Sequence, residues 1–377
     1  MKVLHVITGL GQGGAERQLA SLASASPSEF AVFSMKQPGP MLNEVLASAV
    51  PVFSGGARRR TSPSWFLNLR KAIHEVRPDI VMGWMYHGNL AATLTRRLGH
   101  TGPILWNVRH SLDNINQERV GTRCVIYAGA WLARSPVKIV YNSAIAAEQH
   151  GHLGFPREKE IILPNGFDLS RFKPDPAVSD ARRAQLGIPP NVLLLGVVGR
   201  AHPMKNHLGC LKALKQLIYE GLSVRCVMVG EGVAEPDGPV AGAVREAGLE
   251  AAVSLLPPTQ YPESLYPALD LLVMPSLWGE GFPNVVGEAM ACSVPALVTD
   301  VGDAASVVGN TGFVSESGDP SVLAYRAREA IAHGRESLAD MGALARQRMV
   351  ERYGLASVAA RYRAVCYEAV GRVDVGI

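Results

Sequence analysis

The chain has 377 residues, of which 47% are hydrophobic and 19% charged, and its mean hydropathy is +0.10. This length predicts two domains of ordinary globular composition, and the absence of an uncharged apolar run of 18 residues argues against a membrane span. The five cysteines are scattered, with no CxxC pair and no His/Cys cluster. This usage argues against a structural zinc site and favours a reducing, cytoplasmic compartment.

The net charge of +4 is unevenly distributed along the chain. Residues 1–165 carry 18 Lys and Arg against 10 Asp and Glu, a net charge of +8, and the remaining residues have a net charge of −4. A positive region attracts anionic partners. No nucleic-acid-binding motif accompanies it, so the charge favours an anionic membrane surface or a phosphorylated acceptor over a nucleic acid.

Short apolar, β-rich runs alternate with longer helical stretches along the whole chain. Continuous apolar strands separated by helices predict parallel sheets that are covered on both faces. The expected fold is therefore α/β, with two Rossmann-like domains facing a central cleft. The predicted strands are 2–8, 30–35, 80–84, 104–108 and 138–142 in the first half, and 193–199, 224–229, 252–256, 271–275 and 296–299 in the second.

A segment rich in Pro, Asn, Gly and Asp, LPNGFDLSRFKPDPAVSD, interrupts this alternation. We expect an N-terminal domain over 1–165, a hinge over 166–180 and a C-terminal domain over 181–354. The last segment, 355–377, has helical spacing at Val358, Tyr362 and Val365, and is expected to pack back on the first domain.

The first predicted strand is followed by Gly9-x-Gly11-x-x-Gly14, the spacing of a dinucleotide-binding turn. An NAD site also needs an acidic residue at the end of the second strand, for the ribose hydroxyls. The sequence has Lys36 there and no carboxylate, which disfavours NAD and leaves an NADP variant open. Exposed N–H groups at a helix N-terminus would still suit a phosphate or sugar oxygen.

The stretch from Pro275 to Gly302, PSLWGEGFPNVVGEAMACSVPALVTDVG, contains two carboxylates at a predicted helix start. Glu280 lies in the loop before the helix, and Glu288 lies on it. Pro283 and Asn284 are typical of a helix N-terminus, and N–H groups around Gly281 and Phe282 are expected to contact a ligand's sugar or phosphate. The alternative is a surface loop with two solvated glutamates.

Glu280-x7-Glu288 in EGFPNVVGEAMA resembles the signature of retaining glycosyltransferases of family 4, which have the GT-B fold. Three other segments resemble family segments in the same order: GGAERQL is similar to the N-terminal loop, LPNGFDLSRFKP to the interdomain hinge, and GVVGRAHPMKNH to a donor-binding loop. The resemblance covers nearly the whole chain. Gly287 and Ser293 depart from the family pattern, and TDVGDAASVVG lacks the glutamate common there.

The resemblance implies transfer of a hexose-type sugar from a nucleotide-diphosphate sugar, with retention at the anomeric carbon. We expect UDP rather than GDP as the nucleotide. Arg200 and Lys205 would grip the donor diphosphate, the alternative being a solvated surface pair. Glu280 would bind the transferred sugar and Glu288 the ribose. Gly13 and Gly14 would face the donor across the cleft. A metal-independent reaction with no cofactor besides the donor is expected, because Arg200 and Lys205 supply positive charge and the sequence has no DxD-like cluster. A front-face transfer is expected, because with Glu288 assigned to the ribose no second carboxylate is evident as a nucleophile.

Candidate residues of the first domain follow its predicted strands. His87 follows 80–84 and resembles the family's histidine near the donor sugar, although a lone histidine is more often structural. Arg109 and His110 follow 104–108 and are acceptor-side candidates, with a structural role as the alternative. Glu16, at the start of the first helix, is either an acceptor-side residue or a carboxylate favoured by the helix dipole.

The run Arg58–Arg60 with Trp65 and Phe66 suggests peripheral contact with an anionic membrane, although its charge is low and a solvated loop is favoured. We expect a glycan or lipid-linked acceptor of cell-envelope or exopolysaccharide synthesis, and a cytoplasmic enzyme. The rival functions are a GT-B-fold sugar-nucleotide epimerase and a catalytically inactive nucleotide-sugar-binding subunit. An NAD dehydrogenase is disfavoured, and the GxGxxG spacing is treated as coincidence.

Overall fold

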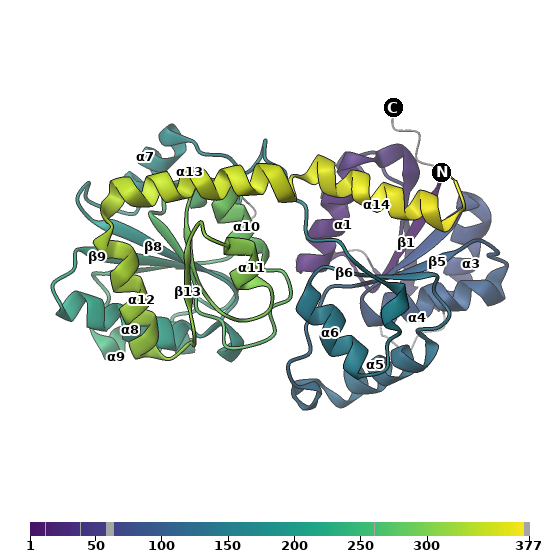
Figure 1. The fold of residues 1–377 in the computed structure, drawn as a ribbon, viewed down its shortest axis with the longest axis horizontal. Coiled ribbons are helices and arrows are strands. Elements are labelled where there is room, and N and C mark those ends of the chain that lie inside the picture. The colour runs from purple at the N-terminus through teal and green to yellow at the C-terminus, as the bar shows by residue number, and fades with distance from the viewer. Residues whose placement is uncertain (12, 38, 58–63, 260, 373–377) are drawn as a thin grey trace. The chain divides into compact units, whose positions relative to one another are not determined.

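The computed structural model describes residues 1–372 except 12, 38, 58–63 and 260, so the basic run Arg58–Arg60 lies outside the described residues. The chain forms two compact units (Figure 1). Unit 1 contains Met1–Gly166 and the segment from Leu355 onward, and unit 2 contains Phe167–Gly354. Each unit is an α/β sandwich around one parallel sheet.

Unit 1 is built on a seven-stranded parallel sheet with the order β3-β2-β1-β4-β5-β6-β7. The strands are β1 (Val3–Ile7), β2 (Phe30–Lys36), β3 (Val52–Ala57), β4 (Ile80–Trp84), β5 (Ile104–Val108), β6 (Lys138–Tyr141) and β7 (Glu160–Ile162). The α-helices are α1 (Gly14–Ala25), α2 (Leu42–Ala47), α3 (Ser64–Val76), α4 (Met85–Leu94), α5 (Val120–Leu132), α6 (Ala144–His152) and α14 (Leu355–Ala369). Short 3-10 turns are η1 (Pro27–Glu29), η2 (Thr95–Leu98), η3 (Ile115–Gln117) and η4 (Arg157–Lys159).

Unit 2 is built on a six-stranded parallel sheet with the order β10-β9-β8-β11-β12-β13. The strands are β8 (Leu193–Val198), β9 (Val224–Val229), β10 (Val253–Leu256), β11 (Leu271–Met274), β12 (Ala296–Thr299) and β13 (Phe313–Ser315). The α-helices are α7 (Pro176–Gln185), α8 (His207–Tyr219), α9 (Pro239–Ala247), α10 (Asn284–Ala291), α11 (Ala304–Val308), α12 (Pro320–Ala332) and α13 (Gly334–Tyr353). Its 3-10 turns are η5 (Pro203–Lys205), η6 (Pro262–Ser264) and η7 (Tyr266–Ala268).

All ten strands predicted from the sequence are present, with ends that agree within one residue. Three strands, β3, β7 and β13, were not predicted from the sequence. All three lie at the edges of their sheets, where one side of the strand has no neighbour and a continuous apolar run is not required. β3 contains two glycines, and β7 starts with the exposed Glu160.

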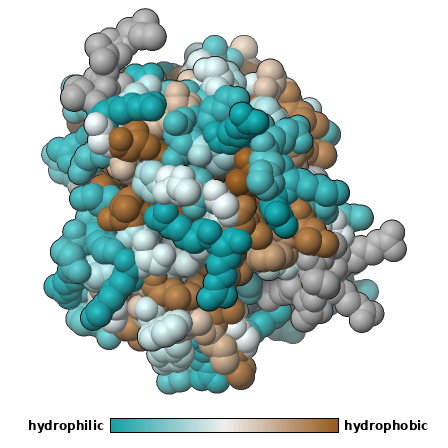
Figure 2. All heavy atoms as spheres, turned by 90° about the vertical axis from the view of Figure 1, so that its right-hand side faces the viewer, coloured by the Kyte–Doolittle hydropathy of each residue, from teal (hydrophilic) through white to brown (hydrophobic). Residues whose placement is uncertain are grey.

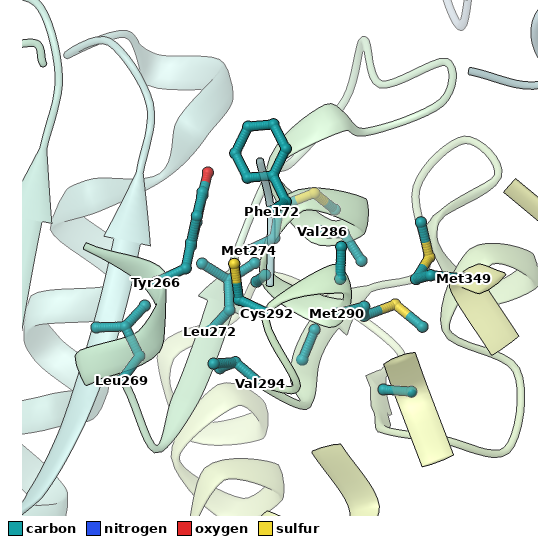
Figure 3. Close-up of a cluster of buried hydrophobic side chains, with 14 of the residues drawn as sticks. Phe172, Tyr266, Leu269, Leu272, Met274, Val286, Met290, Cys292, Val294 and Met349 are labelled. Atoms are coloured by element: carbon teal, nitrogen blue, oxygen red, sulfur yellow. The ribbon is translucent and has the colours of Figure 1, made fainter. Parts of the chain in front are cut away.

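Both faces of each sheet are covered by hydrophobic clusters, because successive residues of a strand point to opposite sides. In β11, Leu272 and Met274 join a cluster with α10 and α13, whereas Leu271 and Val273 join one with α8, α9 and α12. Figure 3 shows the first of these clusters, where side chains from α10 and β11 are packed together. The continuous apolar runs of the sequence are explained by this two-sided burial.

The chain enters unit 2 at Phe167 and returns to unit 1 at Leu355. Residues 166–180 were expected to form a hinge. Gly166 belongs to unit 1, whereas 167–180 pack with unit 2, since Phe167 and Phe172 lie in its core and α7 begins at Pro176. The final helix, α14, belongs to unit 1 and packs against α1. It buries the residues that gave the sequence its helical spacing, Val358, Tyr362, Val365 and Cys366.

One face of the molecule, the possibility of a membrane span and the burial of the cysteines can be checked directly in the structure. On the face drawn in Figure 2, hydrophobic residues are dispersed among hydrophilic ones. No helix within the described residues has both the length and the apolar character needed to cross a bilayer. Four of the cysteines are buried as small apolar residues, whereas Cys124 is exposed on α5.

Candidate active site

The strand order of each sheet marks one point as a ligand site. This point lies between β1 and β4 in unit 1 and between β8 and β11 in unit 2. On either side of it, strands that come later in the chain lie farther toward the edge of the sheet. Ligands of open parallel sheets bind outside the carboxyl ends of the strands at such a switch point. The candidate residues lie there: Gly13 follows β1, His87 follows β4, Lys205 follows β8 and Glu280 follows β11.

In unit 2, two basic residues lie in the turn between β8 and α8. Arg200 is exposed, and within the described part of the chain its guanidinium has no hydrogen-bond or ion-pair partner. Lys205 ends η5, and the left-handed backbone of Asn206, at φ 52°, starts α8 directly after it. The turn thus presents one unengaged guanidinium and one half-buried ammonium group at the end of the central strand.

The structure brings Lys205 and Glu280 together in a tight ion pair. The Lys205 Nζ lies 2.5 Å from the Glu280 Oε1, and the buried Ser276 hydroxyl donates to the same oxygen at 2.6 Å. The two loops are also joined by their main chains, since the Leu277 N–H donates to the Met204 carbonyl at 2.8 Å. Glu280 is only 7% exposed, so its charge is held by these donors rather than by solvent. The alternative of two solvated glutamates is therefore wrong for Glu280.

The loop that carries Glu280 is held against β12. The Thr299 hydroxyl donates to the Ser276 carbonyl at 2.5 Å, and the Asp303 N–H donates to the Gly281 carbonyl at 2.9 Å. Gly302 has φ 62°, and a Cβ there would overlap the Glu280 carbonyl. Only glycine therefore permits this approach, and the loop geometry is fixed before any ligand binds.

Glu288 is buried on α10 and is held by a residue the sequence analysis did not single out. The Tyr266 hydroxyl, on η7, donates to the Glu288 Oε2 at 2.6 Å. Both residues are buried, at 0% and 5% exposure for Tyr266 and Glu288. The reading of Glu288 as a solvated surface glutamate is therefore also wrong. A charge-assisted hydrogen bond of this kind fixes the rotamer of the carboxylate.

The start of α10 combines a helix N-terminus with core packing. Pro283 is the N-cap and Asn284 the first helical residue, and no side chain caps the helix. The Phe282 ring is buried and lies 5.3 Å from the Tyr353 ring, so this residue can offer a ligand only its main chain. A helix N-terminus favours an anion, because the helix dipole places partial positive charge there.

Two of the three departures from the family pattern, Gly287 and Ser293, have physical consequences in unit 2. A Cβ on Gly287 would overlap the Phe167 ring, so the missing side chain lets Phe167 pack directly on α10. Ser293, just after α10, has φ 61°, a left-handed conformation that favours glycine. Neither residue forms part of the Lys205–Glu280 pair.

In unit 1, Gly13 is the N-cap of α1 and Glu16 lies in the first turn. The Glu16 carboxylate folds back over Gly13, where a Cβ would lie 2.5 Å from its Oε2. Burial raises the pKa of Glu16, while a hydrogen bond from its own backbone N–H and the charge of Lys36 act in the opposite direction. Gly14 is the first residue of α1. The glycine loop thus surrounds a carboxylate of this chain.

His87 lies in the first turn of α4, immediately after β4, and is half-buried. The chain enters α4 through Met85, whose φ of 59° is unusual for a residue with a side chain. α4 packs against β1, β4 and β5, so its N-terminus lies at the switch point of the sheet. Figure 1 shows α4 beside the central strands of unit 1.

The structure places Arg109 in a network that ties unit 1 together. Its guanidinium donates to the Tyr362 hydroxyl at 2.8 Å and to the Asn165 side-chain oxygen. It also lies over the Trp84 ring, 5.3 Å from the centroid, and the Asn107 amide donates to the same Tyr362 hydroxyl at 3.1 Å. These contacts hold α14 and the segment around Asn165 against the sheet of unit 1. Arg109 therefore has a structural role, which was one of the two alternatives left open by the sequence.

His110 forms a pair with a carboxylate that the sequence analysis did not single out. Its Nε2 lies 2.9 Å from the Glu118 Oε1, and both side chains are partly exposed. The hydrogen bond to His110 lowers the pKa of Glu118, against the opposing effect of burial. Behind them, the Tyr86 hydroxyl and the buried His150 Nε2 lie 2.9 Å apart. His110 is therefore oriented by a carboxylate, which suits hydrogen bonding to a polar ligand.

The partners missed from the sequence are Ser276, Tyr266, Glu118 and Tyr362. Tyr266 and Tyr362 are far from their partners in sequence, and Glu118 lies in a segment without a motif. Ser276 is only four residues from Glu280, but one polar side chain in a loop is not informative by itself. Within the described ranges no group of three His, Cys, Asp or Glu residues is placed to hold a metal ion.

Comparison with known proteins agrees with this architecture. Residues 12–171 match the family model described as Glycosyltransferase Family 4, and residues 192–333 match the model described as Glycosyl transferases group 1. The putative glycosyltransferase EpsF of Bacillus subtilis is 28% identical over 316 residues, which cover 79% of each chain. The D-inositol 3-phosphate glycosyltransferase of Rhodococcus erythropolis is 37% identical over 170 residues, which cover 42% of this chain and only 37% of that protein.

Solved structures show the same fold. HepE of Anabaena, solved in complex with UDP, has a TM-score of 0.85 at 21% identity, covering 98% of this chain and 100% of that one. Sucrose-phosphate synthase of Thermosynechococcus elongatus has a TM-score of 0.80 at 18% identity, covering 98% and 100%. The two family models show that the chain belongs to the family 4 glycosyltransferases. The solved structures show that its two parallel sheets form the GT-B fold.

Proposed function

We propose that this glycosyltransferase moves a hexose-type sugar from a UDP-sugar to a glycan or lipid-linked acceptor, with retention at the anomeric carbon. The observation that carries the proposal is the Lys205–Glu280 ion pair at the switch point of unit 2, with the exposed Arg200 in the same turn as Lys205. A cytoplasmic enzyme of cell-envelope or exopolysaccharide synthesis fits this activity.

The basic residues suit the leaving group of the reaction. Cleavage of the bond between the anomeric carbon and the phosphate oxygen leaves negative charge on the diphosphate. Arg200 offers a planar fork of donors and Lys205 a point charge, both in place before the reaction. Together with the N–H groups at the start of α10, they would stabilise this charge without a metal ion or a further cofactor.

The two glutamates suit the sugar and the nucleoside. Glu280, fixed by Lys205 and Ser276, would accept hydrogen bonds from hydroxyls of the transferred sugar. Glu288, fixed by Tyr266, would bind the ribose. With Glu288 assigned to the ribose, we propose a front-face transfer. The acceptor oxygen bonds to the anomeric carbon on the side the phosphate leaves, and the leaving phosphate oxygen takes the acceptor's proton.

UDP is the proposed nucleotide because HepE, which shares the fold, has been solved with UDP and with UDP-glucose. The acceptor would lie against unit 1, near His87, Glu16 and the His110–Glu118 pair. Because residues 1–165 carry a net charge of +8, we also propose peripheral contact with an anionic membrane.

The test is a comparison of UDP-, GDP- and ADP-sugars as ligands and donors. We expect UDP-sugars to raise the melting temperature and to release UDP slowly, and Arg200→Ala and Lys205→Ala to remove both effects. Lys215→Ala, at an exposed lysine on α8, is the matched control and should change neither. Binding of no nucleotide sugar, or binding unchanged in both variants, would reject the diphosphate site. Formation of an epimerised nucleotide sugar without UDP release would favour the epimerase. Binding of a UDP-sugar without transfer to any acceptor would favour the inactive binding subunit.

A further inference from the structure

The helix α5 of unit 1 is apolar on two opposite sides. Its inner side is buried through Ile126 and Gly129. Its outer side carries large apolar and aromatic side chains that remain in solvent, with Trp131 81%, Val120 65% and Tyr127 53% exposed. A helix that is apolar all round is ordinarily buried all round, so the outer side of α5 lacks a partner in the part of unit 1 that the structure describes.

The exposed residues form one continuous stripe, not a scatter. Val120, Cys124, Tyr127 and Trp131 are spaced by four, three and four residues, which places them within an arc of about 60° on an α-helix. Isolated exposed hydrophobic residues are ordinary on protein surfaces. An aligned stripe along the full length of a helix marks an interaction surface.

The charged residues on α5 and directly at its two ends are arginines, and the nearest carboxylate in sequence, Glu118, is paired with His110. Arg119 and Arg134, at the two ends of α5, are exposed, and Arg123 lies one turn into the helix. No Asp or Glu occurs between Arg119 and Ala147. Tyr and Trp side chains are favoured where an apolar phase meets water, because each ring has an apolar body and a polar edge.

We propose that α5 is the surface by which unit 1 docks on an anionic lipid bilayer, with the Val120–Trp131 stripe at the level of the acyl chains and the three arginines at the phosphate headgroups. The proposal names the surface for the membrane contact proposed above and rests on that contact, not on the donor chemistry. A helix with an apolar face flanked by basic residues binds in the plane of the interface.

The same features disfavour a second copy of the chain as the occupant. A two-fold contact through α5 would bring the arginines of both copies together, with no carboxylate on the helix to pair them. The stripe is also one side chain wide, whereas a stable interface needs about 800 Å² on each partner. Docking on a bilayer requires neither a carboxylate to pair with the arginines nor a contact area of this size.

The experiment is cosedimentation of the full chain with vesicles of phosphatidylcholine alone and with vesicles containing about one third phosphatidylglycerol. We expect binding to the anionic vesicles only, weakened by salt. Tyr127→Ser with Trp131→Ser should lower the partition coefficient by about 10-fold or more, since both remove area that would enter the bilayer. Tyr219→Ser is the matched control, because Tyr219 is 91% exposed on α8 of unit 2.

A second variant, Arg119→Gln with Arg134→Gln, keeps the stripe and should remove the preference for anionic vesicles. The proposal is overturned by equal binding to both kinds of vesicle, by variants that bind as the parent does, or by a concentration-dependent dimer that the serine variant dissolves. If the serine variant fails to fold by circular dichroism, the arginine variant decides alone. UDP-sugar binding, measured on each variant, should be unchanged, so failure of the donor site is distinguished from failure of α5.

Discussion

The two sheets present different chemistry at equivalent positions. At the switch point of unit 2, the polar groups form short pairs that would face a ligand, Lys205 with Glu280 and Tyr266 with Glu288. At the carboxyl ends of the strands of unit 1, Arg109 binds Tyr362 and Asn165, which belong to the same unit. The pairs in unit 2 hold charged side chains in place, whereas the contacts of Arg109 in unit 1 hold distant segments of the chain together.

The comparison shows that strand order locates a site without assigning its chemistry. Both sheets are parallel, and both place loops at the carboxyl ends of central strands. The difference comes from the side chains those loops carry, which is why the same fold supports many reactions. The following experiments separate the two kinds of polar network, from the largest expected effect to the smallest.

The largest effect is expected from Lys205→Met. Activity should fall by about 10²–10³ because one preorganised donor at the leaving group is lost. The free energy of unfolding should also fall, by about 3–5 kcal/mol, because the buried Glu280 carboxylate loses its cationic partner. The double variant Lys205→Met/Glu280→Gln should recover most of the stability but none of the activity. Urea unfolding and donor turnover measure the two quantities, and recovery of both in the double variant would show that the pair is structural.

The second prediction concerns acid pH and distinguishes the two units. Burial lowers the pKa of His5 from 6.5 to about 3 and that of His150 to about 4, and also lowers that of His100. All three lie in unit 1, while among the described residues of unit 2 only His207 shows such a shift. The unfolded chain therefore binds more protons, so stability is greatest above pH 6.5 and falls as the pH drops toward 4.

Each strongly shifted histidine should contribute a slope of about 1.4 kcal/mol per pH unit in this window. Hydrogen exchange at pH 7.5 and pH 5 should show unit 1 opening before unit 2. His5→Asn should flatten the dependence while still offering an oxygen to the Trp84 Nε1–H, which now donates to His5 at 2.9 Å. Equal loss of protection in both units would contradict the assignment.

The third prediction tests Tyr266 as a positioning residue for Glu288. Tyr266→Phe removes the hydroxyl that donates to the carboxylate and should weaken UDP binding about 10-fold, since hydrogen bonds to charged groups contribute about 1.5–3 kcal/mol. The KM for the donor should rise with little change in kcat. Tyr325→Phe, at a half-exposed tyrosine on α12, is the control. A loss of kcat with KM unchanged would place Tyr266 in a different role.

The smallest effect is expected from Tyr362→Phe in unit 1. The variant leaves the Asn107 amide and the Arg109 guanidinium without the hydroxyl they share, which should lower the free energy of unfolding by about 1–2 kcal/mol. Donor binding should not change, because no donor-site residue of unit 2 is touched. Urea unfolding and UDP titration measure the two results, and an altered affinity for UDP would assign the network a role in the reaction.

Much of this molecule could be predicted from its sequence, because buried parallel strands are continuous apolar runs. All ten such runs are strands. The edge strands β3, β7 and β13 were not predicted, because a strand with a neighbour on one side only does not require a continuous apolar run. The C-terminal helix was predicted from the period of its buried face. The glycine spacing after β1 suggested a dinucleotide turn, yet the structure fills that loop with the Glu16 carboxylate.

The sequence by itself determined the two-sheet architecture, the strand positions and the Glu280-x7-Glu288 motif, since each depends on residues close together in the chain. Only the tertiary structure decided which polar groups meet. Ser276 and Lys205 converge on Glu280, Tyr266 on Glu288, and Tyr362 on Arg109, across separations of up to 253 residues. The physical reason is that a hydrogen bond needs its two groups within about 3 Å, and sheet order, not sequence order, sets that distance.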